Sequence, residues 1–83
     1  MIKIEVSRIH KFNTNGLCKA IVDIVIGESF VITGLKIVEG KEGLFVDMPQ
    51  VKGKDGHWYN SVIPLYREVK IEVDRIVLES YNN

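Results

Sequence analysis

Lysines and aromatic residues stand close together in the stretch KGKDGHWY, Lys52–Tyr59, and side chains of these two kinds could bind nucleic acid. Lysine contacts phosphates as a mobile point charge, and an aromatic face stacked on an unpaired base contributes about 1 to 3 kcal/mol. We therefore expect Lys52 and Lys54 to contact backbone phosphates. Trp58 and Tyr59 are the candidates for base stacking.

The same stretch has a simpler interpretation, in which Trp58 is a structural residue. Its ring would pack beneath the loop and anchor the far side of the loop to the sheet, so that Lys52 and Lys54 project together. Residue composition alone favours this interpretation, because so few lysines make a small electrostatic footprint. It predicts that Trp58→Ala costs roughly 3 kcal/mol or more of stability, as the loss of a large core side chain does.

Other cations could enlarge the patch. Lys41 belongs to a neighbouring turn, and Arg67, Lys70 and Arg75 belong to the C-terminal segment, where acidic residues alternate with them as on a solvated helix face. Eleven Lys plus Arg balance eleven Asp plus Glu over the whole chain. No global positive field therefore attracts nucleic acid or an anionic membrane, and any such binding needs a local patch.

Residues that could support catalysis or hold a metal ion are few and scattered. Cys18 lies inside an apolar segment, where a buried structural thiol is far more common than an activated nucleophile. His10 and His57 fall in different hairpins, with no cysteine or paired carboxylate at metal-ligand spacing. An outward-facing strand position accounts for Asp47. We expect no enzymatic activity, no metal, no cofactor and no small-molecule substrate.

Chain length and composition predict one folded domain spanning residues 1–83, since 46% of the residues are hydrophobic. A core of this size supplies only a few kcal/mol of net stability, so a second subunit is expected. A two-fold axis would duplicate each loop and bring about six lysine contacts onto one surface. The single Cys18, the lack of a leader pattern and the short apolar runs predict a cytoplasmic protein with no membrane contact.

Alternating apolar and polar residues predict a meander of antiparallel strands at about residues 2–9, 17–26, 30–38 and 44–48. Asn15–Gly16 predicts a tight hairpin, because both residues tolerate positive φ. Bulges are expected near Ser7, where the alternation changes phase, and at Thr33–Gly34. Pro49 ends regular pairing, and the composition of segment 50–56 is typical of an exposed, mobile loop.

A short extended piece at 57–63 would complete a sheet of about residues 2–63, and the segment after it predicts a helix at about 65–81. Pro64 suits a helix start, and apolar residues recur at helical spacing, in the order Leu65, Tyr66, Val69, Val73, Ile76, Val77 and Tyr81. Ile71 and Leu78 lie off this stripe, which a second subunit would explain. The pattern thus predicts an α+β fold, a small antiparallel β-sheet meander with a C-terminal helix packed on it, assembled as a homodimer.

Two stretches of the chain carry a family resemblance. ESFVITGLKIVEGKEGLFVDMP, Glu28–Pro49, contains Val38-Glu39-Gly40, Gly43-Leu44-Phe45-Val46 and Met48-Pro49, and KDGHWYNSVIPL, Lys54–Leu65, contains an Asp-Gly-aromatic turn. Both stretches resemble the septation protein SpoVG family, and weaker likeness covers most of the chain. The resemblance implies a homodimeric sheet-and-helix protein that is a non-enzymatic bacterial regulator of cell division and sporulation. It also implies that the regulator acts by binding DNA and RNA.

Two other functions remain open at the level of sequence. One is a protein-interaction or scaffolding module of the division machinery, whose paired loops bind another protein and not nucleic acid. The other is an enzyme, which would require Cys18 to react unusually fast with an alkylating reagent in the folded state. We rank the regulator first and the enzyme last.

Overall fold

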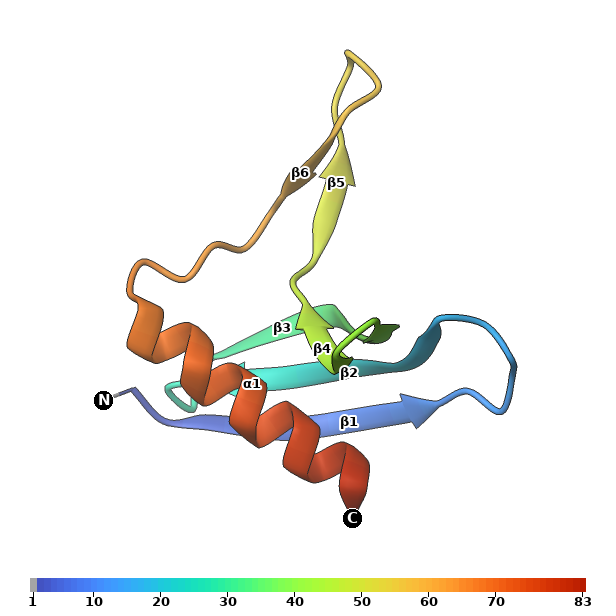
Figure 1. Ribbon diagram of the computed structural model, residues 1–83. Coiled ribbons are helices and arrows are strands. Elements are labelled where there is room, and N and C mark those ends of the chain that lie inside the picture. Colours follow the sequence, from blue (N-terminus) through green and yellow to red (C-terminus); the bar gives the residue numbers. More distant parts are fainter. Residues whose placement is uncertain (1) are drawn as a thin grey trace.

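The computed structural model describes residues 2–83, which form a four-stranded antiparallel sheet, a separate two-stranded hairpin and one C-terminal helix (Figure 1). The sequence therefore predicted the α+β fold class correctly. The elements in chain order are β1 Ile4–Lys11, β2 Cys18–Ile26, β3 Phe30–Gly40, β4 Gly43–Asp47, β5 Gln50–Lys52, β6 Trp58–Asn60 and α1 Arg67–Asn82.

Strands β1 to β4 form a meander in chain order, each paired antiparallel with the next. Both expected bulges are present, and both lie opposite Asp23. Ser7 is the extra residue of β1, and Thr33–Gly34 is the irregularity in β3. Gly34 has a φ of 84°, a value that residues with a Cβ rarely adopt. Its amide donates a hydrogen bond to Asp23 Oδ1. The phase change in the sequence thus marks a real bulge.

The tight turns of the meander lie between β2 and β3 and between β3 and β4, where Gly40 pairs with Gly43, and not at Asn15–Gly16. Gly27 and Glu28 both have a φ of 57°, and the amide of Ser29 donates to the carbonyl of Ile26, as a type I′ turn requires. The prediction of a tight hairpin at Asn15–Gly16 is wrong, because β1 ends at Lys11 and β2 begins at Cys18, and neither Asn15 nor Gly16 has a positive φ. The amide of Gly16 donates instead to Thr14 Oγ1 at 3.0 Å, so a side chain shapes this wider loop.

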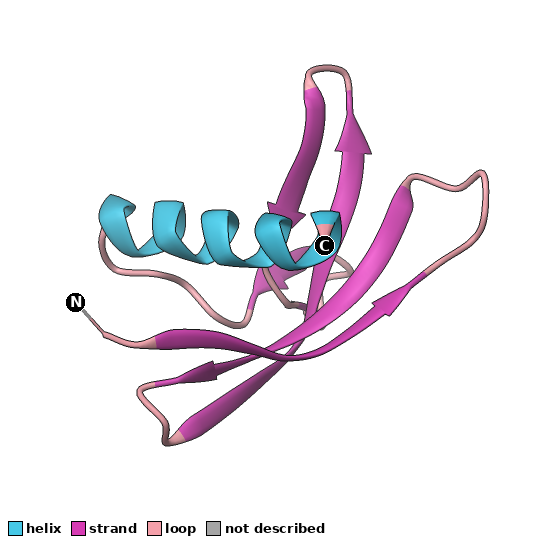
Figure 2. Cartoon of the chain, turned by 90° about the horizontal axis from the view of Figure 1, so that it is seen from below, coloured by secondary structure: helices cyan, strands magenta, loops and turns pink. Residues whose placement is uncertain are grey.

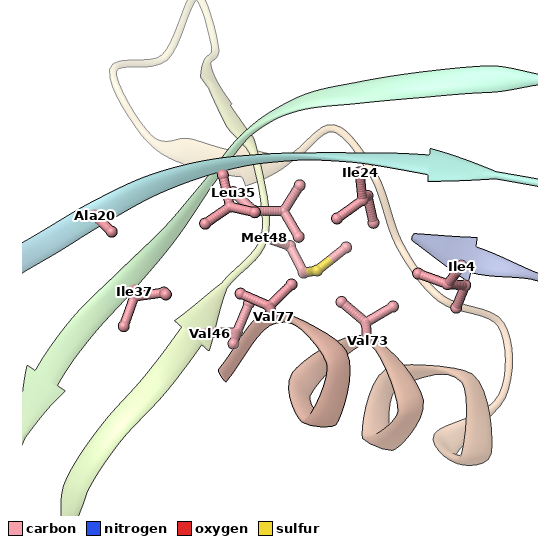
Figure 3. Close-up of a cluster of buried hydrophobic side chains, with 10 residues drawn as sticks. Ile4, Ala20, Ile24, Leu35, Ile37, Val46, Met48, Val73 and Val77 are labelled. Carbon is pink, nitrogen blue, oxygen red and sulfur yellow. The ribbon is translucent and has the colours of Figure 1, made fainter. Parts of the chain in front are cut away.

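Helix α1 lies across one face of the sheet and contacts both edge strands, β1 and β4 (Figure 2). Val73 and Val77 are its buried residues, and they meet the apolar residues of the strands in one cluster (Figure 3). The buried residues of that cluster are Ile4, Ala20, Val22, Ile24, Leu35, Ile37, Val46, Met48, Val73 and Val77. Helix α1 is the only helix of residues 2–83, and it lies on this face. No helix or further strand of these residues covers the opposite face of the sheet. We call the second face the outer face.

The helix begins at Arg67, with Tyr66 as its N-cap residue in an extended conformation. Leu65 and Tyr66 therefore lie before the helix and are exposed, which corrects the start of the predicted stripe. Leu78 packs against the core, so it needs no second subunit to cover it, whereas Ile71 is exposed. No helix within residues 2–83 is both long enough and apolar enough to cross a membrane.

The segment expected as a mobile loop is instead a hairpin, β5 paired with β6, that stands away from the sheet (Figure 1). Pro49 cannot donate a ladder hydrogen bond, so pairing with the sheet stops there. The base of the hairpin is closed by Ser61, whose amide and hydroxyl both donate to the carbonyl of Pro49, at 2.9 and 3.1 Å. An isolated two-stranded hairpin is marginal in water, so these closing contacts matter.

Trp58 does not anchor the hairpin to the core, because 63% of its surface is exposed. The structural interpretation of Trp58 is therefore wrong. The reason is local: β6 pairs only with β5, so neither face of the hairpin lies on the helix-covered core.

We expect Trp58→Ala to change the free energy of unfolding by less than about 1 kcal/mol, because substitutions of exposed residues usually do little. Leu35→Ala is the matched control, since Leu35 is fully buried and its truncation should cost about 2–5 kcal/mol. Urea denaturation followed by circular dichroism measures both. A loss of about 3 kcal/mol in Trp58→Ala would show that the ring is packed in solution.

Candidate nucleic-acid interface

The two faces of the β5–β6 hairpin differ in chemistry. Side chains alternate between faces along a strand, and the register pairs Gln50 with Asn60, Val51 with Tyr59 and Lys52 with Trp58. One face therefore carries Val51 and Tyr59, and the other carries Gln50, Lys52, Trp58 and Asn60. On the latter face Gln50 Nε2 donates to Asn60 Oδ1 at 2.9 Å. This face combines an amide pair, a cation and an aromatic ring.

The tip of the hairpin is fixed by Asp55. Asp55 Oδ1 accepts from the amide of His57 at 2.9 Å, and Asp55 Oδ2 accepts from the hydroxyl of Tyr59. The hydrogen bond from Tyr59 lowers the pKa of Asp55 and raises the pKa of Tyr59, and the His57 amide lowers the pKa of Asp55 further. The ring of Tyr59 lies against Gly53, where an added Cβ would come within 2.7 Å of it. Tyr59 thus braces the turn, and its candidate stacking role is limited to its exposed side.

Lys52 and Lys54 lie together near the tip of the hairpin and are exposed. Neither forms an ion pair with another described residue. Lys41 is also exposed, but it precedes β4 while the hairpin follows β4, so the length of that strand separates Lys41 from the other two lysines. The structure therefore brings together two of the three loop lysines.

The helix cations have other partners. Lys70 pairs with Asp74 and donates to the carbonyl of Val46 at 3.3 Å, and Arg75 pairs with Glu72 and Glu79. The guanidinium of Arg75 lowers the pKa of Glu72. Arg67 is exposed at the first turn of the helix, with no ion pair among the described residues. The structure does not gather these three cations with the hairpin lysines into one cluster.

A cleft lies between the base of the hairpin and the outer face of the sheet. It has a volume of about 310 Å³ and is lined by Thr33, Gly34, Lys36, Asp47, Met48, Pro49, Gln50 and Trp58. Lys36 and Gln50 were not among the sequence-based candidates. Strand alternation could have indicated Lys36, because it has the opposite parity to the core residues Leu35 and Ile37. Gln50 could not be found in this way, since the β5–β6 pairing was not expected.

The remaining candidate residues, such as Cys18 and His10, do not come together in one site. Cys18 is half-buried, and its thiol points to the carbonyl of Ala20 at 3.7 Å. His10 contacts Phe12 edge to face, with ring centroids 5.1 Å apart. Across residues 2–83, no three His, Cys, Asp or Glu side chains come close enough together to hold a metal ion. The expectations about catalysis and metals stay predictions.

These features define the class of protein, a small α+β domain with one half-covered sheet and a projecting hairpin that carries its exposed aromatic and cationic side chains. The sequence model of the SpoVG family matches residues 1–83. A septation protein SpoVG of Archaeoglobus fulgidus is 38% identical over 81 residues, which are 98% of this chain and 95% of that protein.

Two further relatives carry the same protein name. The protein of Staphylococcus saprophyticus is 36% identical over 80 residues, covering 96% of this chain and 79% of the relative. The protein of Lachnospira eligens is 35% identical over 74 residues, covering 89% of this chain and 84% of the relative. The chain belongs to the SpoVG family, as its sequence motifs predicted.

Removal of the Tyr59 hydroxyl should raise the pKa of Asp55 toward the ordinary carboxyl value of 3.8. Because folding lowers the pKa of Asp55, its contribution to stability is present above the pKa of the unfolded chain and is lost as the pH falls through the lower folded value. Carboxyl-carbon NMR titration of wild type and Tyr59→Phe measures the shift. Tyr66→Phe is the control, and equal Asp55 pKa values in wild type and Tyr59→Phe would show that the hydroxyl is not bonded to Asp55.

Proposed function

We propose that this chain is a non-enzymatic regulator of septation and sporulation-type gene expression, which binds DNA or RNA as a homodimer in the cytoplasm. Family membership supports the link to septation, since the relatives carry that name. The observation that supports nucleic-acid binding is the hairpin, which exposes Lys52, Lys54 and Trp58 to solvent on one projection. Lysines without a competing carboxylate are available for phosphates.

The hairpin lysines would supply the main phosphate contacts. A carboxylate paired with a lysine competes with a phosphate for it, so Lys70 and Arg75 are expected to contribute less than Lys52 and Lys54. Lys41 and Arg67 are exposed and could extend the footprint at its edges. Each phosphate neutralised releases counterions, so binding is expected to weaken steeply with salt.

An apolar surface supports the homodimer. A second cleft, of about 370 Å³, lies beside the segment that leads into α1 and is lined almost entirely by apolar side chains, among them Ile63, Leu65 and Tyr66. Leu65 is 87% exposed and Ile63 is 68% exposed. Exposed apolar side chains around an apolar cleft are typical of an interface. A second copy of the chain would cover this surface and double the number of hairpins.

The same apolar surface also supports the alternative, a protein-interaction module of the division machinery that binds no nucleic acid. In that case a different protein would occupy the cleft beside Leu65. The two functions differ in their response to salt, because burial of apolar surface does not weaken as ionic strength rises.

We expect Lys52→Ala/Lys54→Ala to weaken binding of labelled DNA or RNA and to flatten its salt dependence. Four lysines lost from a dimer should reduce the slope of log K against log salt for duplex DNA by about 3 to 4. Fluorescence anisotropy over a salt series measures this slope.

The matched control for the lysine variant is Lys3→Ala/Lys19→Ala, which removes the same charge from lysines that are already paired with Glu5, Glu28 and Glu39. It should bind nearly as wild type. Equal loss in both double variants would show a general charge effect, and no binding at low salt by wild type would contradict the nucleic-acid function.

Leu65→Glu should dissociate the homodimer, because it places a charge in the apolar surface that the second copy covers. The folded monomer should persist, since Leu65 is not part of the core. Sedimentation velocity and circular dichroism measure the two properties. Lys41→Glu is a control for charge alone, and a wild-type chain that sediments as a monomer at high concentration would contradict the dimer.

A further inference from the structure

We propose that the cleft at the base of the hairpin, lined by Lys36, Asp47, Gln50 and Trp58, binds one unpaired guanine of a single-stranded nucleic acid. This inference rests on the proposed function, and it adds to it the strand type and the base that the site selects. The loop lysines contact any phosphate backbone, whereas this cleft would read a base. The two parts of the account can therefore fail separately.

The cleft has the size and the wall that a base needs. Its volume of about 310 Å³ falls at the lower end of the range of about 300–1,000 Å³ for small-ligand sites, which suits a single nucleotide unit. Trp58 lines it and is 63% exposed, so an aromatic face is available at its entrance. A base stacked on an aromatic side chain needs no particular sequence. Selection among bases must therefore come from the polar lining.

Lys36 and Asp47 supply that polar lining from neighbouring strands. They are register partners across β3 and β4, and both side chains line the cleft. Directly opposed residues have Cβ atoms about 5 Å apart, so two such side chains can reach one ligand. Among the described residues they form no ion pair with each other or with any other group. An ammonium donor and a carboxylate acceptor are thus both available to a ligand.

Guanine matches this pair better than the other bases do. Its Watson–Crick edge presents two adjacent donors, N1–H and the N2 amino group, followed by the O6 acceptor. Asp47 would accept both donors in a bidentate, charge-assisted arrangement, and Lys36 would donate to O6. Adenine and cytosine offer one amino group, and uracil or thymine places a carbonyl oxygen on each side of its single N–H. The carboxylate would repel one of those oxygens.

The surroundings of the cleft favour a single strand over a duplex. A base inside a duplex has its Watson–Crick edge occupied, so it can enter the cleft only if it is unpaired or flipped out. A neighbouring hollow of the outer face shares Thr33 and Gly34 with the cleft and is also lined by Arg8, His10 and Phe12. The strand could continue over these rings. On this face Arg8 lies opposite Asp23, and Lys36 lies opposite Asp47. The face is therefore nearly neutral, and its contribution to binding affinity should depend little on salt.

The test uses the intrinsic fluorescence of Trp58, the only tryptophan of the chain. Uridine oligomers with one central guanosine, adenosine or cytidine, and unsubstituted oligouridine, are titrated into the wild-type protein. We expect the guanosine oligomer to change Trp58 fluorescence and to bind about tenfold tighter than oligouridine. Deoxyuridine oligomers with one deoxyguanosine distinguish DNA from RNA as the source of the base. The corresponding duplexes should lose the preference.

Asp47→Ala should remove the guanosine preference without lowering the affinity for oligouridine, because the carboxylate attracts guanine and repels the carbonyl oxygens of uracil. Glu42→Ala is the matched control, because it removes an exposed carboxylate at the β3–β4 turn, away from the cleft. Trp58→Leu should lower the affinity measured by anisotropy for all single strands, and Trp58→Phe should restore it. Phe30→Leu, the loss of another exposed aromatic ring that lines neither this cleft nor the apolar cleft beside Leu65, should have no effect.

Equal affinities for the four oligomers, or an unchanged preference in Asp47→Ala, would overturn the guanine site. If such binding still weakened in Lys52→Ala/Lys54→Ala, the proposed function would stand without the base pocket. If no oligomer bound even at low salt, both would fail. Lys52→Ala/Lys54→Ala should lower affinity for all oligomers by the same factor and keep the guanosine preference.

Discussion

The packing of α1 on one face of a four-stranded sheet is the contact on which the other features depend. Val73 and Val77 complete a core that the strands alone cannot close, because a sheet must bury its apolar face against another layer. Lys11 helps to fix the far end of the helix, since its ammonium donates to the carbonyl of Asn83 at 3.2 Å and lies 5.3 Å from the ring centre of Tyr81. Because the described residues form only one helix, it covers one face of the sheet, and the outer face and the hairpin stay uncovered.

Charge is distributed unevenly despite the balanced total. Four cations form ion pairs with carboxylates, namely Lys3, Lys19, Lys70 and Arg75. Lys11 donates a hydrogen bond to the carbonyl of Asn83 at the end of the helix. The described cations with no such partner are Arg8, Lys36, Lys41, Lys52, Lys54 and Arg67. The hairpin carries two of them, Lys52 and Lys54, whereas Lys36 in the cleft lies opposite Asp47 and adds no net charge there. A net charge of zero is therefore compatible with local cationic surface, and sequence totals underestimate it.

The sequence predicted what depends on local periodicity and missed what depends on pairing partners. Alternation and helical spacing placed the strands and the helix, and the change of phase at Ser7 located a bulge, because these signals lie within one element. The β5–β6 pairing was missed because its contacts, such as Gln50 with Asn60, join residues from two short segments whose composition is typical of loops. The exposure of Trp58 follows from that pairing, so it could not be predicted either. Among the candidate residues, sequence could give side-chain type but not which cations have carboxylate neighbours.

The account holds that nucleic acid contacts mainly the hairpin and the outer face, and that the helix-covered side contributes little. The most direct test is to follow backbone amide NMR signals during titration with a guanosine-containing single strand. The account predicts shifts that cluster in the range 50–60 and around Thr33 to Lys36 and Asp47, with α1 nearly unchanged. Shifts concentrated on α1, or no shifts at saturating oligonucleotide, would contradict it.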